Sequence, residues 1–297
     1  MSVRILEKDT ITRQSADGFK PLIIGQPQTI FESRAARLRQ LAKESFMADY
    51  LLLVGQITQV QANLTAAYQD KVQLQPQISE QMPLSVQHFE PENIWLDILN
   101  DLIEQLAPLV SDDIKTTLEQ LNQQANDALV NYGKALRQGN FELVPAEQAI
   151  FIWAALNTFF SLLVANSRFE WQQEGNENLL HCPLCHSAPV ASMVNDSGHR
   201  YLHCSLCEAQ WNSIRAQCTQ CGDSRQIKLA SLEENDAQVR AETCDECQSY
   251  LKLMFLEKDH QLDAVADDLA SLVLDVKLSE TALLRSGFNP FLLPVLQ

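Results

Sequence analysis

Apolar residues in the first 170 positions recur every three or four residues, the spacing of helices that bury one face. The first helix is expected to begin at Thr29-Ile30-Phe31-Glu32, where a threonine and a glutamate three residues apart form a capping box. We expect an amphipathic surface helix with Arg34 and Arg37 on its polar face. Further helices are expected from about Asp49 to Gln69, from Pro91-Glu92 onward, between a cap at Ser111-Asp112-Asp113 and a stop at Gly139, and from Pro145.

The segment from Ala149 to Ala165 is apolar nearly all round and approaches the length of a membrane span. Polar residues interrupt it at Asn157, Thr158 and Ser161, so we interpret it as a central core helix and expect no membrane insertion. The aromatic and leucine stripes of these helices are likewise interpreted as core, with no chemistry assigned to them.

A different pattern begins after the polar run Glu174-Gly175-Asn176-Glu177-Asn178. Short runs that are typical of strands occur in two sets of three, which predicts a tandem repeat. Its period is 36 residues at the first cysteines of the two units, Cys182 and Cys218. The first set is Val190 to Val194, His199 to His203 and Trp211 to Ala216, and the second is Gln226 to Leu232, Ala237 to Thr243 and Tyr250 to Leu256. A last helix is expected from about Leu262 to Leu278, with Val265, Leu269, Leu272, Val273 and Val276 on the face that packs on the core.

These patterns predict an α+β multidomain protein. An N-terminal α-helical bundle is followed by two tandem small β units, which resemble rubredoxin or zinc ribbons, and by a C-terminal helical tail. The expected domains are residues 1–175, 176–216, 217–258 and 259–297.

All eight cysteines lie in the β units, in four Cys-x-x-Cys pairs with none left over. A two-residue gap lets one tight turn direct both sulfurs at one point, and two such turns complete a tetrahedral thiolate shell. The sequence therefore predicts two four-cysteine metal sites, whose ligands are Cys182, Cys185, Cys204 and Cys207 in one and Cys218, Cys221, Cys244 and Cys247 in the other.

Sequential pairing of the four turns closes the shorter loops, although an interleaved pairing of the first with the third also satisfies the spacing. Disulfides are disfavoured because they need an oxidising compartment, which the N-terminus does not suggest, and thioredoxin-like chemistry because no βαβ pattern surrounds the pairs. Nearby histidines, including His186 and His203, are surplus to a shell of four thiolates. Iron and zinc both accept such a shell, which leaves no open position for a substrate.

The net charge and the sequence motifs disfavour several classes of function. A net charge of −16, with seven Lys and Arg against ten Asp and Glu between residues 181 and 258, disfavours binding of nucleic acid. The N-terminus has no apolar signal segment, which predicts a cytoplasmic protein. No dinucleotide fingerprint, phosphate loop or nucleophile elbow occurs, so an enzyme is not expected.

The chain resembles a family of bacterial accessory proteins that are required for formate dehydrogenase activity. The resemblance covers roughly residues 180–297 and depends on the runs Cys182-Pro183-Leu184-Cys185, Gly198-His199-Arg200-Tyr201-Leu202-His203-Cys204-Ser205-Leu206-Cys207, Ala241-Glu242-Thr243-Cys244-Asp245-Glu246-Cys247, Ser249-Tyr250-Leu251-Lys252, Val265-Ala266-Asp267-Asp268-Leu269-Ala270-Ser271-Leu272 and Asn289-Pro290-Phe291-Leu292. The first turn departs from the usual form, since His186 stands where such turns often carry glycine.

The resemblance implies two rubredoxin-like metal sites, with iron favoured over zinc, and binding to the catalytic subunit of a molybdenum-dependent formate dehydrogenase in the cytoplasm. A redox role, in which the metals prime the client enzyme before its export, is a further hypothesis. A stand-alone rubredoxin-like electron-transfer protein and a zinc-ribbon protein-interaction module remain the alternatives. The sequence assigns no residues to client contact.

Overall fold

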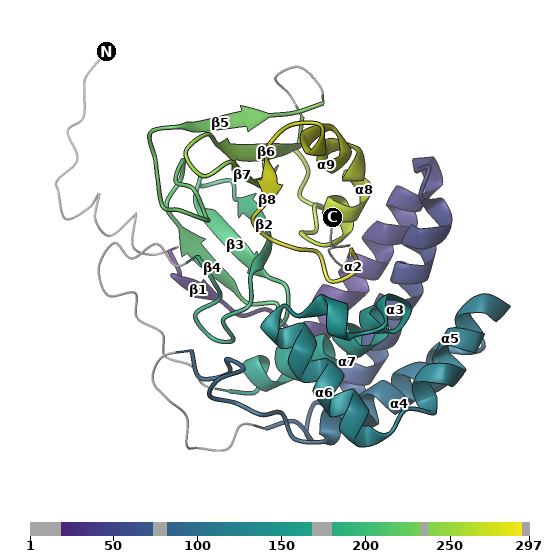
Figure 1. The fold of residues 1–297 in the computed structure, drawn as a ribbon. Coiled ribbons are helices and arrows are strands. Elements are labelled where there is room, and N and C mark those ends of the chain that lie inside the picture. The colour runs from purple at the N-terminus through teal and green to yellow at the C-terminus, as the bar shows by residue number, and fades with distance from the viewer. Residues whose placement is uncertain (1–18, 74–81, 168–179, 233–236, 293–297) are drawn as a thin grey trace, which may run out of the picture.

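A computed structural model describes residues 19–73, 82–167, 180–232 and 237–292. Helices gather on one side of the molecule and a sheet on the other (Figure 1). The helical part comprises α2 (Pro27–Leu41), α3 (Ala48–Tyr68), α4 (Ile94–Leu106), α5 (Asp112–Asn122), α6 (Asn126–Gln138) and α7 (Ala146–Ala165). This order of helices followed by a sheet confirms the predicted α+β class.

The start of α2 differs from the prediction. The helix begins at Pro27, before the expected capping box, and its N-cap residue Gln26 makes no side-chain hydrogen bond to the helix. Proline suits this position because its φ is already helical and its missing N–H would have no intrahelical acceptor. The predicted solvent-facing position of Arg34 and Arg37 is also wrong, because both side chains are buried against acidic residues that are distant in the sequence.

The segment between Ser111 and Gly139 forms two helices, where the sequence predicted one. The chain leaves the helical conformation at Ala125, whose ψ of 144° is extended, and the carbonyl of this residue accepts the N–H groups that start α6. Both helices, on either side of the bend, pack against α7. Neither glycine nor proline marks it in the sequence.

Gly139 ends α6 as expected, with a left-handed φ of 79°. An added Cβ would meet no atom within 4 Å, so only backbone strain opposes a side chain there. Gly139→Ala should lower the free energy of unfolding by about 1–2 kcal/mol, the cost of a left-handed backbone with a Cβ. Urea denaturation checks this against Asn131→Ala on the same helix, which should leave stability nearly unchanged, and equal effects of the two substitutions would contradict the assignment.

Three strands per unit form as predicted: β2 (Pro189–Val194), β3 (Arg200–Cys204) and β4 (Gln210–Ser213), then β5 (Ile227–Ala230), β6 (Val239–Cys244) and β7 (Ser249–Phe255). They share one sheet with the short strands β1 (Leu22–Ile23) and β8 (Leu284–Arg285), in the order β1-β4-β3-β2-β7-β6-β5, with β8 paired to β7. Parallel pairing of β2 with β7 joins the two units, with Ser192 opposite Leu253. The predicted boundary near residues 174–178 lies outside the described residues, and the four-domain division stays a prediction.

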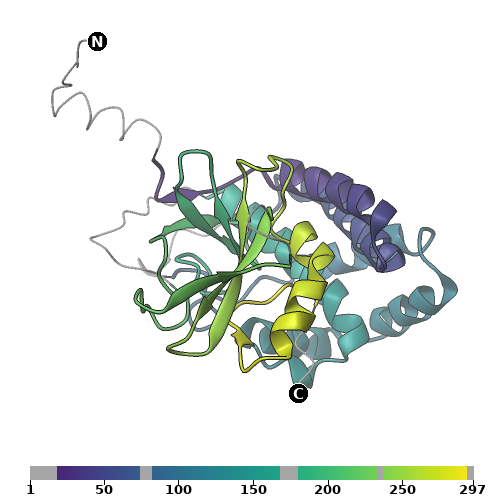
Figure 2. The same cartoon turned by 90° about the horizontal axis from the view of Figure 1, so that it is seen from above.

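The C-terminal helix is also divided, into α8 (Ala266–Ala270) and α9 (Leu272–Ser279), which lie beside the sheet in Figure 2. The break is at Ser271, where the ammonium of Lys252 on β7 donates to the carbonyls of Asp268 and Ser271 at 2.8 and 3.2 Å. The predicted buried face is correct at Val265 and Leu269. It is wrong beyond the break, where Val273 and Val276 are exposed while Leu274 and Leu278 are buried, because the break turns α9.

The central helix is α7, as expected. Within the described ranges it is the one helix long and apolar enough to cross a membrane, yet 89% of its most apolar stretch is buried inside the protein. The main hydrophobic cluster joins α7 to the other helices and also to the four cysteines of the first β unit. The helices and the first cysteine cluster therefore share one core.

Candidate metal centres

Each of the four Cys-x-x-Cys turns ends in a residue with left-handed backbone geometry. The φ values after the second cysteine are 62° at His186, 61° at Glu208, 77° at Gly222 and 54° at Gln248. The turn thus requires a conformation that glycine adopts most easily, although glycine occurs once. The N–H of His186 donates to the carbonyl of Cys182 at 2.9 Å, as that of Gly222 does to Cys218 at 3.1 Å, so the histidine preserves the turn.

The first cluster contains Cys182, Cys185, Cys204 and Cys207, and all four side chains are buried. The sulfur of Cys185 lies 3.4 Å from that of Cys204 and 3.6 Å from that of Cys207. A tetrahedral metal with metal–sulfur bonds of about 2.3 Å requires sulfurs about 3.8 Å apart, whereas a disulfide joins them at about 2 Å. The cluster therefore has the chemistry and nearly the dimensions of a tetrathiolate shell.

The second cluster contains Cys218, Cys221, Cys244 and Cys247, whose sulfurs all lie within 4.8 Å of one another. Cys218 and Cys247 are 3.6 Å apart, and Cys221 and Cys244 are 3.7 Å apart. Each cluster thus combines two turns that are consecutive in the sequence. The turns therefore pair sequentially, and not in the interleaved arrangement. Both clusters could hold a metal ion.

Helix α7 and the connector before α4 hold the turns of the first cluster by their backbone. The indole N–H of Trp153 donates to the carbonyl of Ser205 at 3.0 Å, and the amide of Asn157 donates to that of Leu206 at 2.8 Å. The N–H of Leu84 donates to the carbonyl of Leu184 at 2.8 Å. These contacts were not predicted from the sequence, in which the polar Asn157 within an apolar helix is the one available signal.

A buried charge network continues from the first cluster to α2. Glu208, which follows Cys207, accepts hydrogen bonds from the guanidinium of Arg34 at 2.9 and 2.6 Å and from the amide of Asn157 at 2.9 Å. Arg34 also pairs with Asp263 at 2.9 Å, and the ring of His203 lies 2.7 Å from Glu208. Burial opposes ionisation of Glu208, but Arg34 and His203 outweigh it and hold the pKa of this carboxyl well below its usual value.

The hydroxyl of Ser249 lies beside two sulfurs of the second cluster. The hydroxyl of Ser249 lies 3.5 Å from the sulfur of Cys218 and 3.0 Å from that of Cys247, whereas Ala209 occupies the equivalent position after Cys207. Burial raises the pKa of Cys218, but Ser249 and the backbone N–H groups of Cys221 and Gln220 lower it to about 7 overall. This environment favours the thiolate form, which binds metal.

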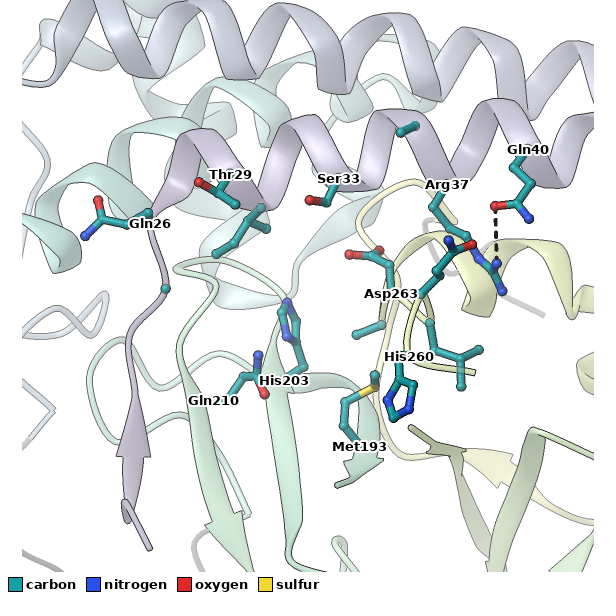
Figure 3. A pocket seen from close by; sticks show the side chains of 16 residues that line it. Gln26, Thr29, Ser33, Arg37, Gln40, Met193, His203, Gln210, His260 and Asp263 are labelled. Atoms are coloured by element: carbon teal, nitrogen blue, oxygen red, sulfur yellow. Dashed lines mark hydrogen bonds between the residues drawn. The ribbon is translucent and has the colours of Figure 1, made fainter. Parts of the chain in front are cut away.

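The histidines of the β units lie outside both clusters, as the surplus of thiolates predicted. The rings of His181 and His186 contact each other with centroids 4.8 Å apart. His203 is engaged by Glu208 and also lines a pocket of about 710 Å³ between α2, the strands and residues 260–264. Figure 3 shows His203 pointing from the strands towards α2, with Gln210 near it, and Asp263 lying between His203 and Arg37. Arg37 and Asp263 already form ion pairs, with Asp267 and Arg34 respectively.

Comparison with known proteins gives a consistent result over almost the whole chain. Family models described as FdhE N-terminal, FdhE central domain and FdhE C-terminal domain match residues 19–168, 181–215 and 216–292. Proteins named "Protein FdhE homolog" are 40% identical in Haemophilus influenzae, over 99% of each chain, and 41% identical in Shewanella oneidensis, over 92% of each chain. The crystal structure of the FdhE protein from Pseudomonas aeruginosa is similar, with a TM-score of 0.81 and 33% identity over 93% of this chain and 99% of that one.

Proposed function

The chain belongs to the FdhE family, and from this premise we propose that it binds the catalytic subunit of a molybdenum-dependent formate dehydrogenase and supports its maturation in the cytoplasm. The family assignment itself supports an accessory factor for formate dehydrogenase. The observation that carries the proposal is the shared core of the helices and the first cysteine cluster. A stand-alone electron carrier would need the cysteine units alone, whereas here a large helical body is built around one of them.

We also propose that the eight cysteines bind two metal ions, one in each cluster. The family resemblance favours iron, and zinc is the alternative. Iron in such a shell would supply one-electron chemistry, whereas zinc would supply structure alone. Four thiolates complete a tetrahedral shell, so neither site offers an open position to a substrate, and this supports a role that is not enzymatic.

The surface charge fits a protein partner better than a nucleic acid. The net charge of −16 would repel phosphates. Nucleic-acid binding depends on cationic side chains, and in this chain they are outnumbered by acidic ones. The core position of α7 supports the expectation of no membrane insertion.

The accessory role is tested by deleting the gene in its own host and measuring formate dehydrogenase activity and the amount of catalytic subunit. We expect activity to fall while the subunit is still synthesised, and we expect the returned chain to restore activity and to copurify with that subunit. Undiminished activity in the deletion strain, together with no copurification, would refute the proposal.

The redox hypothesis has a separate test. Returning the protein with redox-silent zinc at both sites should fail to activate the client if the metals transfer electrons. Full activation by the zinc form would exclude redox priming and leave the binding role intact.

A further inference from the structure

The two cysteine clusters differ in their access to solution. All four ligand side chains of the first cluster are buried, at 0 to 5% exposure. In the second cluster Cys221 is exposed and Cys247 is partly exposed, while Cys218 and Cys244 are buried. The sulfur of Cys221 is therefore a point where the second shell meets solvent.

The first cluster is also packed more closely against the rest of the protein than the second. The first cluster belongs to the main hydrophobic core, and α7 and the connector cover its turns. The cysteines of the second cluster belong to none of the hydrophobic clusters in the described part of the chain. Only opening of the contacts with the helices would expose the first shell, whereas the second is already open on one side.

The rim of the second cluster is charged and self-paired. Arg225 contacts Asp223 at 2.8 Å, and Lys228 pairs with Asp245. Exposed leucines lie close to these pairs, since Leu284 pairs with Ser249 and Leu229 follows Lys228. The second cluster therefore opens onto a surface of both charged and apolar residues.

We propose that the second site exchanges its metal with small chelators and reacts with thiol reagents past the sulfur of Cys221, whereas the first site is a closed structural centre. The exchange is a ligand substitution, in which donor atoms of the chelator replace thiolate sulfurs and no electron is transferred. This proposal rests on the metal occupancy proposed above. It assigns different roles to two sites whose sequence spacing is nearly the same.

The test uses the full-length zinc form and an excess of EDTA without denaturant. One of two metal equivalents should leave at least about tenfold faster than the other, because loss from the buried site requires local unfolding. In parallel, iodoacetamide labelling followed by peptide mass spectrometry should modify Cys221 first and the other ligands of its cluster next, before any ligand of the first cluster. Equal release rates, or earlier labelling of the first cluster, would overturn the proposal.

Two controls test the unequal access of the two clusters separately from their metal occupancy. Cys221→Ser should remove the fast equivalent and leave the slow one, while loss of the slow equivalent would count against the assignment. If the purified chain holds no metal, the proposed occupancy fails. The labelling order of the eight thiols then still tests whether the two clusters differ in access to solution. Labelling of the second cluster first then supports unequal access, and uniform labelling overturns it.

Discussion

Replacing Cys204 with serine should unfold the protein. Cys204 is fully buried in the first cluster and also ends β3, next to the turn that Trp153 and Asn157 hold. A structural tetrathiolate metal contributes about 10–16 kcal/mol of binding free energy, against a net stability of about 5–15 kcal/mol for a typical domain. If the first cluster holds the proposed metal, its loss removes an amount of free energy comparable to the whole stability of the fold. Circular dichroism, size-exclusion chromatography and metal analysis measure the result.

The matched control is Cys221→Ser, which removes a ligand of the same type from the exposed cluster. This variant should stay folded and lose the metal of the second site, because the ladder of β6 with β7 and the main core do not depend on Cys221. A folded Cys204→Ser protein with unchanged melting temperature would contradict the structural role of the first site. An unfolded Cys221→Ser protein would contradict the difference between the sites.

Arg34→Met should lower the free energy of unfolding by about 3–5 kcal/mol, the usual cost of removing one partner from a buried ion pair. Methionine retains an unbranched apolar stem, while the carboxylates of Glu208 and Asp263 lose their cation. Glu208 then remains buried with fewer donors, and its negative charge is no longer balanced by the guanidinium. Denaturant unfolding followed by tryptophan fluorescence measures the change.

Arg39 on the same helix gives the control. Its side chain is exposed and bonds only Gln59 at 3.4 Å or more among the described contacts, so Arg39→Met should change stability by less than about 0.5 kcal/mol. Adding Glu208→Gln to Arg34→Met should recover part of the loss, since the amide carries no charge. Equal losses in Arg34→Met and Arg39→Met would show that the buried network contributes little.

Features that depend on short spacings were predictable from the sequence. The Cys-x-x-Cys pairs identified all the residues that form the two clusters, and short strand-like runs placed the six main strands of the β units. The all-round apolar composition of α7 placed it at the centre. In each case the physical cause acts within a few residues, so one stretch of sequence contains the whole signal.

Features that depend on long-range contacts were not predictable. Helical periodicity placed Arg34 towards solvent because three partners that bury it, Glu208, His203 and Asp263, lie more than 160 residues away. The break at Ser271 likewise involves Lys252, whose ammonium donates to the carbonyl of Ser271 and to that of Asp268 in α8. The difference in burial between the clusters also arises from packing against the helices, because the ligand spacings alone are nearly equal.

Metal content and visible absorption of the full-length protein, purified without oxygen, test the central claim most directly. We predict two metal ions per chain, corresponding to the two four-cysteine clusters, with thiolate-to-iron charge-transfer absorption if the metal is iron. Two colourless zinc ions would keep both tetrathiolate sites and exclude electron transfer through them. A native, folded chain without metal, in which the eight cysteines are free thiols or disulfides, would contradict the account.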